Sequence, residues 1–379
     1  MTWRTATAPA SSTSRAAAFD PDAFAAFLGA QRDLGPKWVP TFVRVVGAFP
    51  MTETNKVLKR ELVRERFDTR DPIWWRPDRD LTYVPLGRAL IDRAQGGSVS
   101  YSLILIDDPA PAVRRITLNR PEKRNALNAT LRWEILSATR ELDRDPEVRV
   151  TVIRGAGKCF SAGYDLSGDP NAQGEPLDYN SEGEGSYMRG VTNGWMSIWD
   201  LAKPVIAQVH GYCLAGGSEL ATGCDLVYVA DDAKIGYPAV RFGTPDMQYH
   251  AWLFGMRGGM ESMLTGDSFS GVDAAQLGWA NRAYPVEELE EQVLAIASRI
   301  AQIPSDLVQI NKRTVHRAME VMGLRSSIRA GTELSALATH TETMKKFVAD
   351  IQSTGLRDTL TKRDTPFGDY RTAEPRDDA

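Results

Sequence analysis

Two short glycine-bearing turns constrain most strongly how this chain folds. They read CFSAGYDL at 159–166 and HGYCLAGGSEL at 210–220; each follows an apolar run with strand character, and the second opens a predicted helix. Small residues let the backbone approach another group closely, and the first amides of a helix lack partners within it. Either turn alone also fits an ordinary tight turn. Together they predict amides that converge on an oxygen gaining negative charge.

The segments around these turns alternate in character from residue 101 onward. Strand-like runs such as RRITLNRP, RVTVIRGAG, PVIAQVHG and LVYVADD are separated by helical ones such as NATLRWEILSATRELDRD and SELATGCD. Alternating strands and helices predict an α/β fold. The polar, acidic stretch 168–187 predicts a long loop, and from about residue 286 the pattern is nearly all helical.

Composition narrows the class of protein. The 379 residues allow two domains, and the formal net charge of −4 provides no overall cationic field for nucleic acid. No apolar run reaches the roughly 18 residues of a membrane span. The three cysteines lack CxxC spacing, so we expect reduced, buried thiols and a cytoplasmic protein. No cluster has metal-ligand spacing, so no metal is expected.

Four motifs in order carry a family resemblance. They are LNRPEKRNALN (118–128), GKCFSAGYDL (157–166), the segment 203–238 and LTGDSFSGVDAAQLGWANRAYP (264–285). Over about residues 101–372 the chain resembles the crotonase (enoyl-CoA hydratase/isomerase) superfamily. The resemblance implies a spiral of ββα units at 101–285 and a helical region at 286–379 that assembles homotrimers or hexamers. The substrate would be an acyl-CoA or enoyl-CoA, with coenzyme A part of the substrate and no separate cofactor.

The same resemblance implies the site residues. The oxyanion amides would belong to Ser161 and Gly216, with Glu219 as the catalytic carboxylate. The residues expected to contact coenzyme A or line the acyl path are Lys123, Arg124, Ala126, Ala162, Gly163, Tyr164 and Tyr237. Lys123 and Arg124 also fit solvated loop charges, and Tyr237 also fits simple packing. Asp165 is expected to cap the turn that follows it.

One of the two glutamates expected from the family resemblance is missing from this sequence. Glu219 fits both a first-turn acid that complements the helix dipole and a desolvated carboxylate with a raised pKa. The family's second glutamate follows a proline, and here that position is Ala239. Asp246, Tyr249 and His250 lie downstream as substitutes. A histidine could titrate near neutrality, but a structural role is favoured for His250, and Asp246 also fits a helix N-cap.

Three functions remain open. The nominal reaction is addition of water to a 2-enoyl-CoA in fatty-acid or related acyl-CoA degradation. An isomerase or C–C bond hydrolase would use the same oxyanion hole with Glu219 as the sole carboxylate. A non-catalytic acyl-CoA-binding partner of an acyl-CoA synthetase would explain Ala239 by decay of the site.

The first hundred residues differ in character. Residues 1–20 predict a disordered leader, and 87–100 a linker. Residues 21–86 predict a small α+β fragment. They resemble the C-terminal tail of AMP-binding acyl-CoA synthetases, with Lys56 at the lysine of that tail's motif. The synthetases' large ATP-binding domain has no counterpart here, so we expect no adenylate formation. The fragment would be a fusion remnant or a docking module for a synthetase.

Overall fold

A computed structural model describes residues 20–30, 42–45, 73–75, 84–85, 101–167 and 186–368 of this chain. The chain divides into two compact units, Met1–Ser100 and Tyr101–Ala379. In the first unit, helix α1 (Pro21–Ala30) accompanies an antiparallel sheet of β1 (Phe42–Arg44), β2 (Ile73–Trp75) and β3 (Val84–Pro85). The predictions for Lys56, for the linker and for most of the leader and the 168–187 loop lie outside the described residues.

The second unit contains all the motifs. Its strands are β4 (Ile104–Ala110), β5 (Val113–Leu118), β6 (Val150–Gly155), β7 (Val205–Val209), β8 (Tyr212–Leu214), β9 (Leu226–Ala230), β10 (Lys234–Gly236), β11 (Phe269–Ser270) and β12 (Arg282–Tyr284). Its α-helices are α4 (Ala129–Arg144), α5 (Ser186–Trp199), α6 (Gly216–Gly223), α7 (His250–Leu253), α8 (Gly255–Thr265), α9 (Gly271–Leu277), α10 (Val286–Ala301), α11 (Ser305–Val321), α12 (Leu324–Thr339), α13 (Glu342–Thr354) and α14 (Leu356–Asp364). Short 3₁₀ turns are η2 (Pro121–Lys123), η3 (Pro238–Arg241) and η4 (Thr365–Phe367).

A six-stranded sheet in the order β12-β9-β7-β6-β5-β4 forms the centre of this unit. β4 and β5 pair as an antiparallel hairpin, and every other neighbouring pair is parallel. Parallel strands require crossover connections, and α4 is the helix of the β5–β6 connection. The strands β11, β10 and β8 form a smaller sheet in that order. The predicted α/β fold is confirmed.

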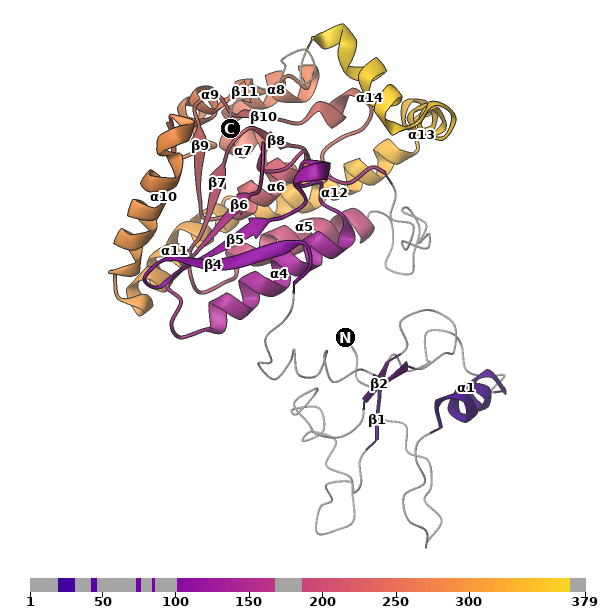
Figure 1. Cartoon of the computed structure of the whole chain (residues 1–379). Helices are drawn as coiled ribbons and strands as arrows, with labels where there is room; N and C mark the ends of the chain where they lie inside the picture. The colour runs from indigo at the N-terminus through magenta and orange to yellow at the C-terminus, as the bar shows by residue number, and fades with distance from the viewer. Residues whose placement is uncertain are drawn as a thin grey trace, which may run out of the picture. The chain divides into compact units, whose positions relative to one another are not determined.

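Helix α4 shows how the sequence directs an element. The Asn128 side chain accepts a 2.9 Å hydrogen bond from the Leu131 amide and so caps the first turn. Leu131, Ile135 and Leu142 recur at helical spacing, and all three are buried, as their pattern predicted. Figure 1 shows α4 and α5 on one side of the sheet and α10 on the other.

The C-terminal part is helical, as predicted, from α10 to α14. The three cysteines are free and buried, again as predicted. Within the described residues, no helix combines the length and the apolar character needed to cross a membrane.

Replacement of Leu131 tests the packing of α4. The side chain is fully buried, so Leu131→Ala should lower the free energy of unfolding by about 2–5 kcal/mol. Leu105→Ala removes the same atoms at a position that is 55% exposed and should cost less than about 1 kcal/mol. Urea denaturation of both variants measures this, and equal losses would contradict the packing described.

Candidate active site

Three of the sequence motifs meet at one edge of the large sheet. β5, β6 and β7 are parallel neighbours, so their carboxyl ends lie at the same edge. The RPEKRNALN segment follows β5, the FSAGYD turn follows β6, and the LAGGSE turn follows β7 and β8. Ligands of parallel α/β sheets bind outside the carboxyl ends of the strands. The topology therefore explains why motifs distant in sequence form one site.

The two glycine-bearing turns are in direct contact. Ser161 pairs with Cys213 in an isolated parallel bridge, and Leu127 pairs with Tyr164 in another. A Cβ atom on Gly163 would lie only 3.5 Å from the Gly216 amide nitrogen. Ala215, just before α6, has the positive φ of 46°, which a non-glycine residue seldom adopts. The expected convergence of the two turns is present.

Gly216 presents the first unpaired amide of α6. Among the described residues no acceptor is assigned to this amide, and the first intrahelical-type bond runs from the Glu219 amide to the Ala215 carbonyl at 3.1 Å. The ring of Tyr164 covers Gly216 so closely that an added Cβ would meet its carbons at 2.7–2.8 Å. Glycine is required here by that ring.

The prediction that the Ser161 amide is an oxyanion donor is wrong in this geometry. Its N–H donates to the Tyr212 carbonyl at 3.0 Å. Its hydroxyl donates to the Asn125 carbonyl at 2.8 Å and accepts from the Gly163 amide at 3.2 Å. Ser161 therefore holds the turn together. The Tyr164 amide, three residues later, has no acceptor assigned among the described residues, and its neighbour Gly163 lies next to the Gly216 turn.

Glu219 lies at the centre of a buried hydrogen-bond network. Its carboxylate is completely buried and accepts bonds from the Tyr164 hydroxyl, the Tyr237 hydroxyl at 2.9 Å and the Met247 amide at 3.0 Å. The Tyr164 hydroxyl also accepts from Trp195 Nε1 at 3.1 Å. Burial, followed by the nearby charge of Asp246, raises the pKa of Glu219 to about 8, although the three donors oppose that rise.

A cavity of about 360 Å³ lies beside these turns. The residues that line it include six of the predicted ligand contacts, namely Lys123, Arg124, Ala126, Ala162, Tyr164 and Tyr237. Gly163, Gly216 and Glu219 stand just behind this lining. Tyr164 and Tyr237 therefore separate the Glu219 carboxylate from the open space. Ala239 is part of the wall, so a side chain at that position faces the cavity.

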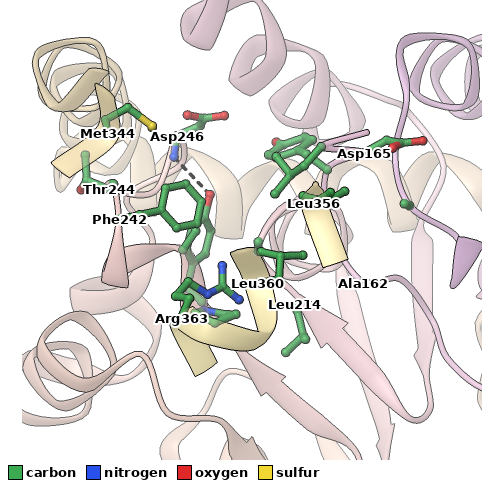
Figure 2. Close-up of a pocket in the computed structure, with 18 of the residues that line it drawn as sticks. Ala162, Asp165, Leu214, Phe242, Thr244, Asp246, Met344, Leu356, Leu360 and Arg363 are labelled. Atoms are coloured by element: carbon green, nitrogen blue, oxygen red, sulfur yellow. Dashed lines mark hydrogen bonds between the residues drawn. The ribbon is translucent and has the colours of Figure 1, made fainter. Parts of the chain in front are cut away.

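The far side of the cavity comes from segments that the sequence motifs did not include. Figure 2 shows Phe242, Thr244 and Met344 together, with Leu356, Leu360 and Arg363 of α14 between them and Ala162. The side chain of Asp364, at the end of α14, is buried and pairs with Arg241 at 3.3 Å and with Arg363 at 2.6 Å. This ion cluster attaches α14 to η3 and closes the cavity.

Asn125 is a further positioning residue that the motif did not single out. It has a positive φ of 52°, a conformation that asparagine tolerates better than most residues. Its amide donates to the Ala156 and Cys159 carbonyls, both at 2.9 Å. These bonds connect the Lys123–Arg124 loop to the FSAGYD turn.

The other polar candidates have structural roles. Asp165 accepts from the Ser167 amide at 3.0 Å, so its predicted capping role is confirmed, and it also pairs with Arg120 at 3.0 Å. His250 was expected to be able to titrate near neutrality, but burial lowers its pKa to about 4. Its ring stacks on Tyr249 with centroids 4.1 Å apart. The Tyr249 hydroxyl donates to Ser218 Oγ at 2.8 Å.

Comparison with known proteins agrees with this site. The sequence profile described as Enoyl-CoA hydratase/isomerase matches residues 109–369. A probable enoyl-CoA hydratase of Mycobacterium leprae is 32% identical over 273 residues, covering 71% of this chain and 99% of the relative. The hydroxycinnamoyl-CoA hydratase-lyase of Pseudomonas fluorescens is 32% identical over 213 residues, covering 54% of this chain and 75% of the relative.

Solved structures resemble the second unit. An enoyl-CoA hydratase from Mycobacterium smegmatis has a TM-score of 0.65 at 30% identity, covering 73% of this chain and 98% of its own. An enoyl-CoA hydratase/isomerase from Xanthobacter autotrophicus Py2 has a TM-score of 0.65 at 33% identity, covering 71% and 99%. The chain belongs to the enoyl-CoA hydratase/isomerase family and has the crotonase fold.

The raised pKa of Glu219 predicts a pH-dependent stability. Between its ordinary pKa of 4.5 and about 8, this group is protonated when folded and ionised when unfolded. Folding then takes up a proton, so the stabilisation present at low pH is lost as the pH rises toward 8. The free energy of unfolding of the native chain, relative to Glu219→Gln, should therefore fall from pH 5 to pH 8.

Urea denaturation at several pH values measures this difference. Glu261→Gln, at an exposed position of α8, is the matched control and should follow the native chain at every pH. A constant difference between the native chain and Glu219→Gln would contradict the assigned pKa.

Proposed function

We propose that this chain is an enoyl-CoA hydratase that stabilises the enolate of an acyl-CoA thioester. The observation that carries the proposal is the contact of the Gly163–Tyr164 turn with the unpaired Gly216 amide beside the cavity. The amides of Tyr164 and Gly216 would bind the thioester oxygen as it gains negative charge. A donor of this kind contributes roughly 3–4 kcal/mol to the transition state.

The cavity lining supports binding of a thioester with an apolar acyl group. Lys123 and Arg124 lie at one part of the wall and suit the phosphates of coenzyme A, while Ala126 and Ala162 leave room for a linear chain. Leu214, Phe242, Met344, Leu356 and Leu360 make the remaining wall mostly apolar. A fatty, branched or alicyclic acyl group fits this surface.

Ala239 favours a second candidate within the same family. Its methyl group faces the cavity where a second glutamate would stand in the hydratases. Isomerisation of an enoyl-CoA moves one proton and needs one acid–base group, whereas hydration also activates water. An isomerase with the same oxyanion amides therefore remains the alternative reaction.

Assembly into trimers is part of the proposal. The C-terminal helices carry exposed apolar side chains, among them Ile310, Val315, Val321, Leu334 and Leu337. Contiguous exposed apolar surface is typical of protein interfaces.

The first unit is proposed as a docking module for a separate acyl-CoA synthetase.

Loss of the conjugated absorbance of crotonyl-CoA and longer 2-enoyl-CoAs tests hydration, and conversion of 3-enoyl-CoAs tests isomerisation. Gly216→Ala would displace the Tyr164 ring and the adjacent amides, so kcat should fall about 100-fold or more. Gly190→Ala, where an added Cβ meets nothing within 4 Å, should leave kcat unchanged. Binding of coenzyme A thioesters without turnover of any would overturn the enzymatic proposal.

Ala239→Glu tests whether a second carboxylate completes the hydratase. Because position 239 faces the cavity, the variant should hydrate crotonyl-CoA about tenfold faster or more, in line with the contribution of a positioned general base. Ala239→Gln controls for size. An equal effect of both substitutions would mean that the added charge does not act on water.

A further inference from the structure

The described part of the cavity wall contains three aspartates, Asp165, Asp246 and Asp364, and two of these form ion pairs with arginine. Asp165 pairs with Arg120, and Asp364 pairs with Arg241 and Arg363. Asp246 forms no such ion pair within the described residues, although the charge of Arg132 lowers its pKa and partly opposes the effect of burial. A carboxylate that is already paired with arginine is a weak base, because the cation stabilises its charged form. Asp246 is therefore the aspartate of the wall best able to take up a proton.

The hydrogen bonds of Asp246 leave one oxygen available. Ser335 of α12 donates to Oδ1 at 2.9 Å, which fixes the carboxylate in orientation. No residue in the described part of the chain donates a hydrogen bond to Oδ2. Oδ2 is also not one of the fully buried polar atoms that lack a hydrogen-bond partner. The residue as a whole is half-buried and is part of the cavity lining.

Glu219 is placed differently. Its two oxygens already accept three hydrogen bonds, and the rings of Tyr164 and Tyr237 stand between it and the cavity. Glu219 itself is completely buried and is not among the residues that line the cavity. Glu219 is connected to Asp246 through the backbone, however, because the amides of residues 246 and 247 donate to Tyr237 Oη at 3.4 Å and to Glu219 Oε1 at 3.0 Å.

Asp246 also lies on the wall that contains Ala239. Residues 238, 239, 242, 243, 244 and 246 all line the cavity in succession. Figure 2 shows Asp246 beside Phe242 and Thr244, with Ala162 and Asp165 across the cavity. The carboxylate missing at 239 is thus available seven positions later on the same segment. Burial raises the pKa of Asp246, which makes it a stronger base than an ordinary aspartate.

We infer that Asp246 is the catalytic residue that exchanges a proton with the acyl-CoA, and that Glu219 is a positioning residue behind it. This inference rests on the proposed function. In hydration, the Asp246 carboxylate takes a proton from water while the water oxygen bonds to C3, which gives the enolate. The protonated Asp246 then delivers that proton to C2. In isomerisation, it moves a proton from C2 to C4, and no other reactant is needed.

Exchange of the C2 protons of butyryl-CoA in D₂O, followed by NMR, isolates the proton step from hydration. Asp246→Asn should lower the exchange rate about 100-fold or more, with the dissociation constant for butyryl-CoA within about threefold of the native value. Glu219→Gln keeps the acceptor for Tyr237 and Met247 and should retain exchange within about tenfold. Asp108→Asn, an exposed position of β4, is the matched control for the substitution.

Retention of exchange by Asp246→Asn would overturn the assignment of Asp246. Loss of exchange in Glu219→Gln would overturn the positioning role of Glu219. Asp246→Ser, a smaller neutral replacement, provides the same test if the asparagine variant does not fold. A native enzyme that exchanges no C2 proton and turns over no enoyl-CoA would overturn the proposed function itself, and the role of Asp246 with it.

Discussion

A completely buried carboxylate organises the site of this protein. The side chain of Glu219 has no exposed surface, so its polar atoms are tolerated only where hydrogen-bond partners replace the lost hydration. Those donors come from three separate segments: the turn after β6, the turn after β10 and the segment before α7. Satisfying one side chain therefore fixes the mutual positions of two cavity walls and of the turn that covers Gly216. An incompletely bonded Glu219 would leave all three segments less well defined.

The parts of the fold that depend on local pattern could be predicted from the sequence. The spacing of Leu131, Ile135 and Leu142 predicted α4, and the apolar runs predicted the parallel strands. The convergence of the two turns was also predictable, because both follow strands that end at the same edge. The resemblance to the crotonase family supplied Lys123, Arg124 and Tyr237, which do line the cavity.

Properties that depend on a distant partner could not be predicted. Nothing in FSAGYD indicates that the Ser161 amide donates to the Tyr212 carbonyl and is therefore not available to a ligand. The pairing of Asp165 with Arg120 and of Asp364 with Arg241 arises from contacts between residues distant in sequence. The same holds for His250, whose ring is enclosed by aromatic neighbours that make its protonation unfavourable.

The part of the cavity wall that α14 contributes is separate from the turns around Glu219. The turns at the sheet edge carry the proposed oxyanion amides, whereas Leu356, Leu360 and Arg363 of α14 line another part of the cavity wall. Under the proposed function, substitutions in α14 would alter the space offered to the acyl group, while the three residues that bond to Glu219 lie in other segments.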